Sequence, residues 1–106
     1  MESINLMDVT EFHPKNPYAK PLHVDKNGRA LLFALHPDQS IREHNAPSSP
    51  FYIVILKGRG VFTSEDGNGQ TFGPGTLLIF GPGENHSIRA LEELVFISIL
   101  HGAPGA

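Results

Sequence analysis

Short apolar runs separated by glycine and proline dominate this chain. Five runs are rich in β-branched and aromatic residues, and they cover residues 30–35, 51–56, 61–64, 76–80 and 94–100. None continues at 3.6-residue spacing for the length of a convincing helix, and the turn residues recur at intervals typical of all-β proteins. The pattern therefore predicts at least six strands and no significant helix.

Three segments refine this picture. "SEDGNGQ", residues 64–70, contains two Asx-Gly pairs whose residues tolerate positive φ, so it predicts a hairpin. The run at 94–100 is apolar on both faces, which predicts a strand in a sheet covered on both sides. Residues 1–25 are irregular and proline-rich, and we interpret them as an N-terminal arm or edge strand before a β-barrel domain at 26–106.

Composition narrows the class of protein. A chain of 106 residues is expected to form one domain. It has no cysteine, which excludes disulfides, thiolate nucleophiles and sulfur-rich zinc sites. Eight basic and eleven acidic residues give a net charge of −3 without a basic run, so we expect no nucleic-acid partner. The apolar runs are too short to span a bilayer and no signal-peptide pattern is present, so we expect a cytoplasmic protein without a membrane partner.

An all-β chain of this size must manage the edges of its sheets. A jelly roll of two sheets is one solution. An immunoglobulin-type sandwich is the alternative. Its usual core disulfide and core tryptophan are both impossible here, because the chain has no cysteine and no tryptophan. The turn pattern favours the jelly roll.

The spacing of glycines and one histidine in the second half carries a resemblance to a known family. Gly75, Gly83 and His86 fall in register with the second motif of the cupin superfamily, G-x5-P-x-G-x2-H-x3-N. Gly81 replaces the usual proline and Ala90 the closing asparagine. Turn glycines on both sides of "TLLIF" would aim His86 into the mouth of a barrel.

The first cupin motif, G-x5-H-x-H-x3,4-E-x6-G, is matched at its ends. His44 lies six residues after Asp38, which stands at the family's glycine position, and Gly58 closes the strand that follows. The middle departs from the family, with Ala46 at the second histidine position and Phe51 or Pro50 near the glutamate position.

The resemblance implies an all-β jelly-roll barrel, the double-stranded β-helix, with a metal held by three histidines and a carboxylate. The family's metals are Mn, Fe, Ni or Zn, which suit imidazole and oxygen ligands. Only His44 and His86 remain in register, and stable sites normally have three or four protein ligands. His36 and His101, each at the end of an apolar run, are the candidates for a further ligand.

Other residues extend the expected mouth. Phe51 would make it more apolar, and Arg89, three residues after His86, is a candidate contact for an anionic ligand. The alternative interpretation is that His44 and His86 only hydrogen-bond inside the barrel, that His36 and His101 are solvated strand ends, and that the aromatic rings belong to the core.

Three functions remain open from the sequence. The first is a small single-domain cupin that binds a divalent metal, a small organic ligand or both. The second is a metal-dependent enzyme of the dioxygenase, isomerase or decarboxylase kind, and the third is a metal-free sensor of a small ligand. Because the runs at 30–35 and 94–100 exceed what one barrel must cover, we also expect a homodimer, with the arm lying across a neighbour.

Overall fold

The computed structural model describes residues 1–44 and 49–102, with the side chains of Glu43 and His44 outside that description. This part of the chain contains nine strands and no helix, which confirms the predicted all-β class. Nor does it contain a helix long and apolar enough to cross a membrane. The strands are β1 (Tyr18–Asp25), β2 (Gly28–Leu35), β3 (Ser40–His44), β4 (Phe51–Lys57), β5 (Gly60–Thr63), β6 (Gly69–Phe72), β7 (Leu77–Phe80), β8 (His86–Ala90) and β9 (Leu94–His101).

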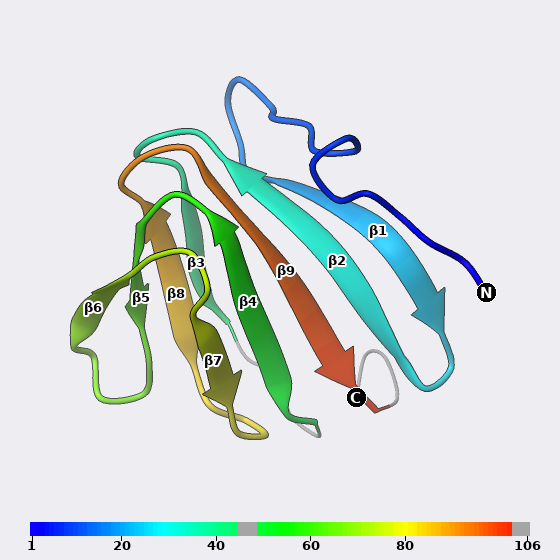
Figure 1. Cartoon of the computed structure of the whole chain (residues 1–106). Coiled ribbons are helices and arrows are strands. Elements are labelled where there is room, and N and C mark those ends of the chain that lie inside the picture. The colour runs from blue at the N-terminus through cyan, green and yellow to red at the C-terminus, as the bar shows by residue number, and fades with distance from the viewer. Residues whose placement is uncertain (45–48, 103–106) are drawn as a thin grey trace.

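The strands form two antiparallel sheets that pack face to face (Figure 1). The five-stranded sheet has the order β1-β2-β9-β4-β7, and the four-stranded sheet has the order β3-β8-β5-β6. Neighbours in each sheet are often distant in sequence, as in a jelly roll. The predicted jelly-roll fold is therefore confirmed.

The hairpin predicted at residues 64–70 joins β5 to β6. Gly67 has a φ of 76° and its N–H donates to the carbonyl oxygen of Ser64 at 3.0 Å. Asn68 N donates to the carboxylate of Asp66 at 2.9 Å. The residues that tolerate positive φ thus close this turn, as expected.

The N-terminal region divides at residue 18. Residues 18–25 form the edge strand β1, which pairs with β2 along its length. Before it, Val9 and Phe12 pack against a small cluster formed by Leu32, Ala34 and Val95. This segment lies against its own sheet, where its apolar side chains cover that cluster.

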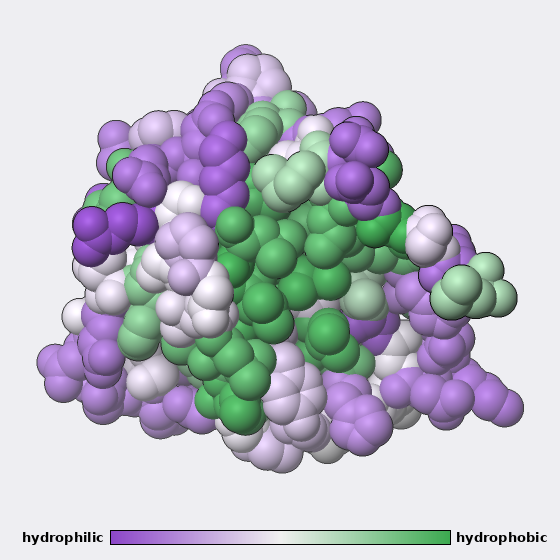
Figure 2. Space-filling view, viewed as in Figure 1, coloured by the Kyte–Doolittle hydropathy of each residue, from purple (hydrophilic) through white to green (hydrophobic). Residues whose placement is uncertain are grey.

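This contact explains part of the two-sided apolar pattern of β9. Val95 is fully buried on the outer face of the five-stranded sheet, whereas Ile99 on the same face is 39% exposed. Figure 2 views this outer face and shows a continuous apolar area over β9, β4 and β7. The N-terminal segment therefore covers one part of the face and leaves the other open.

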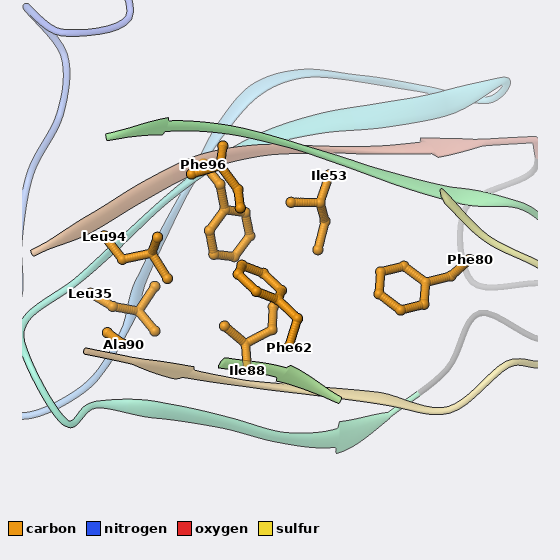
Figure 3. Packing of buried hydrophobic residues seen from close by; sticks show 9 residues of the cluster. Leu35, Ile53, Phe62, Phe80, Ile88, Ala90, Leu94 and Phe96 are labelled. Carbon is orange, nitrogen blue, oxygen red and sulfur yellow. The ribbon is translucent and has the colours of Figure 1, made fainter. Parts of the chain in front are cut away.

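The main core lies between the two sheets (Figure 3). Ile53 and Phe96 point inward from the five-stranded sheet and meet Phe62 and Ile88 from the other. Burial of each such side chain contributes about 1.5–3 kcal/mol relative to exposure. The full cluster is Leu35, Ile53, Ile55, Phe62, Phe80, Ile88, Ala90, Leu94 and Phe96.

The barrel has two ends that matter for the site. At one end β4 and β8 begin and β7 ends, and we call this the mouth end. At the other, which we call the closed end, the ends of β2 and β8 lie close together: Asp38 N donates to the carbonyl oxygen of Ala90 at 2.9 Å. Side chains from the two ends of β8 are separated by roughly 13 Å along the strand.

Candidate functional site

A tight turn at residues 81–84 places His86 at the mouth end. Pro82 and Gly83 occupy the central positions, Gly83 has a φ of 77°, and Glu84 N donates to the Gly81 carbonyl oxygen at 3.1 Å. Proline followed by a positive-φ glycine is the pattern of a type II turn. Gly81 N also donates to Oε1 of Glu84 at 3.0 Å, which fixes the turn further. As predicted, β8 begins at His86 directly after it.

His86 is buried between two phenylalanine rings. Its ring centroid lies 4.8 Å from that of Phe51 and 4.6 Å from that of Phe80, with interplanar angles of 21° and 29°. Only 1% of the residue is exposed. Nδ1 lies 3.4 Å from the carbonyl oxygen of Glu84, to which it donates in the tautomer protonated at that nitrogen. The environment of the imidazole is thus largely apolar.

The backbone register brings the two predicted metal ligands to adjacent strands. His44 is the Cα partner of His86 across the β3–β8 pair. The side chain of His44, and Ala46 at the position of the second family histidine, lie outside the described residues.

A cavity of about 170 Å³ opens at the mouth end between the β5–β6 hairpin and β7. Phe62 and Gln70 are register partners, so both point toward this space from neighbouring strands. Phe80 lines the cavity and also stacks on His86, which is not itself a lining residue. The lining consists of Phe62, Ser64, Asn68, Gln70, Phe72, Leu78, Ile79, Phe80 and Glu84.

The structure does not bring His36 to the mouth. It follows β2 at the closed end, where its ring stacks on Phe12 at 4.8 Å and its Nδ1 lies 3.8 Å from Glu93 Oε2. The expectation that His36 lies near His86 is therefore wrong, because β2 ends where β8 ends and not where β8 begins.

His101 lies at the mouth end but on the outer face of the sheet. In β9, Leu94 and Phe96 point into the core, and the alternation of a strand then turns His101 outward. Its neighbours there include His23, Asp25 and Arg29, around a shallow hollow of about 250 Å³. The predicted approach of His101 to His86 does not occur.

Arg89 is turned away from the mouth as well. It lies between the inward-facing Ile88 and Ala90, so its side chain points to the outer face of the four-stranded sheet. There it is half exposed, and its NH1 lies 3.7 Å from Oδ1 of Asp38. An odd spacing of three residues from His86 places it on the opposite face, which corrects the expectation of a contact with a ligand at the mouth.

Comparison with known families decides the class of this domain. Residues 31–100 match the family model described as cupin domain. The chain belongs to the cupin family. The resemblance carried by Gly75, Gly83 and His86 is thus confirmed at the level of family and fold.

Several solved structures share the fold of this cupin across nearly its whole length. A protein with a double-stranded β-helix domain from Klebsiella pneumoniae has a TM-score of 0.91 at 16% identity, covering 100% of this chain and 94% of its own. A protein from Thermus thermophilus has a TM-score of 0.90 at 20% identity, covering 98% and 100%. An RmlC-like cupin from Desulfovibrio desulfuricans has a TM-score of 0.87 at 20% identity, covering 95% and 96%. No curated protein sequence matches the chain.

The described donors of this cupin do not complete a metal site. Among the side chains that the structure describes, no three His, Asp or Glu residues are placed to hold one ion. The neighbours of His86 on two sides are phenyl rings, which offer no lone pair to a divalent metal. Phe51, near the family's glutamate position, thus puts an apolar ring against the imidazole.

The cavity residues on the hairpin and on β7 were missed by the sequence analysis. Gln70 and Phe72 belong to a short strand with little apolar character, so periodicity gave no sign of them. The alternation of side chains in the hairpin does indicate them. If Phe62 points inward, its register partner Gln70 points to the same side of the sheet.

Proposed function

We propose that this cupin binds a small organic molecule in the cavity at its mouth end. The observation that carries the proposal is the combination of an apolar wall and polar groups in one recess. Phe62, Phe72 and Phe80 supply the apolar wall, whereas Ser64 and Gln70 supply hydrogen-bonding groups. Five of the nine lining residues are apolar and four are polar, and small-molecule sites generally combine an apolar wall with a few placed polar groups.

The size of the cavity limits the ligand to about one ring. An apolar protein cavity of roughly 150 Å³ accommodates benzene, and the space here is about 170 Å³. A compact molecule with one ring and one polar head group therefore fits best. Binding of so small a molecule is expected to have a Kd on the order of 1 mM.

The charges around the cavity favour a neutral or cationic head group. None of the described lining residues is lysine or arginine, whereas Glu84 contributes a carboxylate. A second carboxylate lies nearby, because Glu65 Oε2 accepts a hydrogen bond from Asn85 N, the residue after Glu84. An anionic head group would meet like charge from Glu84 and Glu65.

His86 contributes to this site indirectly. Its stacking contact with Phe80 supports the ring that forms one wall of the cavity. We regard His86 as a positioning residue in this proposal, because it contacts Phe80 and is not among the lining residues.

Three probes with the same ring test the proposal: benzamide, benzamidine and benzoate. Ligand-observed NMR should detect binding of neutral benzamide and cationic benzamidine, and benzoate should bind more weakly because of the carboxylates of Glu84 and Glu65. Failure of both benzamide and benzamidine to bind at several millimolar would contradict the proposal, as would preferential binding of benzoate.

Two tryptophan variants on one strand provide the control. Gln70→Trp fills the cavity and should abolish benzamide binding. Thr71→Trp is the matched variant, because Thr71 pairs with Val61 on the opposite face of β6. It should leave binding unchanged. Equal effects of the two variants would place the probe elsewhere.

A weakly held divalent metal is the second candidate, favoured by the register of His44 with His86. Zn, Mn, Fe or Ni would suit two imidazoles with open coordination positions. Elemental mass spectrometry of the purified protein and of the His44→Ala, His86→Ala double variant tests it. A near-stoichiometric metal that the variant loses supports this candidate, and a protein that neither contains nor takes up these ions rules it out.

A further inference from the structure

The cavity at the mouth end reaches an open edge of the five-stranded sheet. Strand β7 pairs with β4, and within residues 1–44 and 49–102 no strand pairs with the other side of β7. Leu78, Ile79 and Phe80 all line the cavity, although successive side chains of a strand point to opposite faces of its sheet. The recess therefore extends to the edge of β7 and is not confined to the interior of the barrel.

Two residues of β7 direct their backbone groups away from β4. Ile55 N on β4 donates to the carbonyl oxygen of Thr76 at 3.0 Å, directly before β7 begins. Hydrogen-bonded and non-hydrogen-bonded pairs alternate along an antiparallel ladder. By the register of β4 with β7, the backbone groups of Leu78 therefore bond to β4, and those of Leu77 and Ile79 point outward. The edge thus offers N–H donors and carbonyl acceptors to a further strand.

The side chains of β7 leave this edge open to association. Its sequence, "LLIF", has no charged residue and no proline, the residues that usually prevent pairing at a sheet edge. Leu77 and Ile79 are also 55% and 62% exposed. A further strand would therefore find outward backbone groups and apolar side chains along one edge.

An extended peptide paired with this edge would direct one side chain into the cavity. Directly opposed residues of an antiparallel pair share a face of the sheet. A peptide residue opposite Leu78 would thus point inward, toward the space lined by Phe62 and Phe72. Its neighbours in the peptide, opposite Leu77 and Ile79, would pack on the exposed side. The cavity of about 170 Å³ accommodates one ring at the inward position.

The acidic groups at the mouth end favour a basic residue in the same peptide. In antiparallel pairing, the peptide residue two positions before the inward ring lies opposite Phe80. Glu84, in the turn that follows Phe80, lines the cavity, and Glu65 Oε2 accepts a hydrogen bond from Asn85 N at 2.6 Å. A lysine or arginine opposite Phe80 would therefore approach two carboxylates.

We propose that the ring received by the cavity is the aromatic side chain of an extended basic peptide, which adds to the edge of β7 as a further strand. This inference rests on the proposed binding of a ring in the cavity. In strand addition of this kind, main-chain hydrogen bonds supply affinity and side chains that enter pockets supply specificity. The matching peptide pattern, read from the N-terminus, is basic, apolar, aromatic, apolar.

The synthetic peptide acetyl-Lys-Val-Phe-Val-Thr-amide tests the proposal in an NMR titration of labelled protein. It should shift the amide signals of Leu77 and Ile79 and bind about tenfold more tightly than benzamide, because backbone hydrogen bonds are added to the contact of the ring. Benzamide should compete with the peptide, since both rings occupy one cavity. Replacing the phenylalanine of the peptide by alanine should abolish detectable binding.

N-methylation of the peptide backbone provides the matched control. The N–H groups of the two valines, opposite Leu77 and Ile79, would donate to β7, whereas the N–H of the phenylalanine would point away from it. N-methylation of both valines should weaken binding by about tenfold or more, and N-methylation of the phenylalanine should change it by less than about twofold.

Leu77→Pro removes a donor from the edge of β7 without changing the lining of the cavity. Leu77 is the first residue of the strand and its N–H points outward, a position at which proline is tolerated. Circular dichroism and a thermal melt establish that the variant is folded. It should bind the peptide about tenfold more weakly, and it should bind benzamide as the unmodified protein does.

The outcomes separate this inference from the proposed function. Binding of benzamide without binding of the peptide would overturn the inference alone, whereas failure of both ligands would overturn both proposals. Peptide binding with which benzamide does not compete, or equal effects of the two N-methylation patterns, would also overturn the inference. A dimer that Leu77→Pro converts to a monomer in sedimentation velocity would assign the edge to a second copy of the chain and overturn it as well.

Discussion

At the scale of single residues, the mouth of this cupin is defined by a histidine held between two phenyl rings. Phe51 stands near the position where the family resemblance places a carboxylate, and it stacks on His86 at 4.8 Å. A carboxylate at that position could ligate a cation, whereas a phenyl ring contributes dispersion and burial against the face of the imidazole. The side chains that contact His86 therefore form an apolar wall at the mouth end.

Asp38 provides a test of backbone strain at the residue scale. It is the one non-glycine residue with positive φ, at 71°, within residues 1–44 and 49–102. Asp38→Gly should raise the free energy of unfolding by up to about 1 kcal/mol, because glycine adopts this conformation without steric cost. The contact with Arg89 that it removes is exposed and worth little.

Asp38→Ala is the counterpart in the same denaturation experiment. Alanine has a Cβ but no polar group to compensate, so this variant should be less stable than the unmodified protein by about 1 kcal/mol. An Asp38→Gly variant less stable than Asp38→Ala would contradict the assignment of strain.

The exposed pair of His23 and Asp25 predicts a pH effect. The hydrogen bond from the His23 ring lowers the pKa of Asp25 below its usual 3.8, and Asn27 N contributes further. Because the folded pKa is depressed, any stabilisation by this pair is present above the unfolded pKa and is lost as pH falls through the folded one. NMR titration of Asp25 should show the low pKa.

His23→Ala should move the Asp25 pKa upward toward 3.8. His13→Ala is the control, since His13 Nδ1 accepts from Lys15 N and Asn16 N and is not a partner of Asp25. An Asp25 pKa that is the same in the His23→Ala variant would show that the hydrogen bond does not persist in solution.

At the scale of elements, two turns with the sequence Gly-Pro-Gly fix the ends of β7 and the start of β8. Gly75 and Gly83 have φ values of 85° and 77° at corresponding positions. These turns could be predicted from sequence because glycine and proline act locally. By contrast, β3 is polar and pairs with β8, more than forty positions away in the chain, so periodicity contained no sign of it.

Substitutions at Gly58 and Gly67 distinguish two costs of adding a side chain in a turn: backbone strain and steric overlap. Their φ values are 78° and 76°, so both resist a side chain equally on conformational grounds. A Cβ on Gly58 would overlap the Glu93 carbonyl oxygen, whereas a Cβ on Gly67 would meet nothing within 4 Å. Gly58→Ala should therefore cost more than about 3 kcal/mol of stability and Gly67→Ala about 1 kcal/mol.

Chemical denaturation of the two variants measures this difference. If Gly58→Ala is tolerated as well as Gly67→Ala, the β4–β5 turn and the β8–β9 turn do not approach each other as closely as described.

At the scale of the whole molecule, the family and the mouth could be predicted from sequence, but the ligand set could not. His86 was placed correctly because a local turn aims it. Placing His36 and His101 required the direction of each strand and the face to which each residue points. Strand direction and the face of each residue depend on long-range pairing, such as that of β2 with β9. The spacing of residues along the chain does not reveal such pairing.

Intermolecular NOEs show whether the recess at the mouth end receives a small ring. With benzamide added in excess to labelled protein, we expect NOEs from the ring protons of the probe to Phe62, Phe72 and Leu78, all of which line the cavity. NOEs only to Leu77 and Ile99, which are exposed and do not line the cavity, or none at several millimolar benzamide, would contradict this binding site.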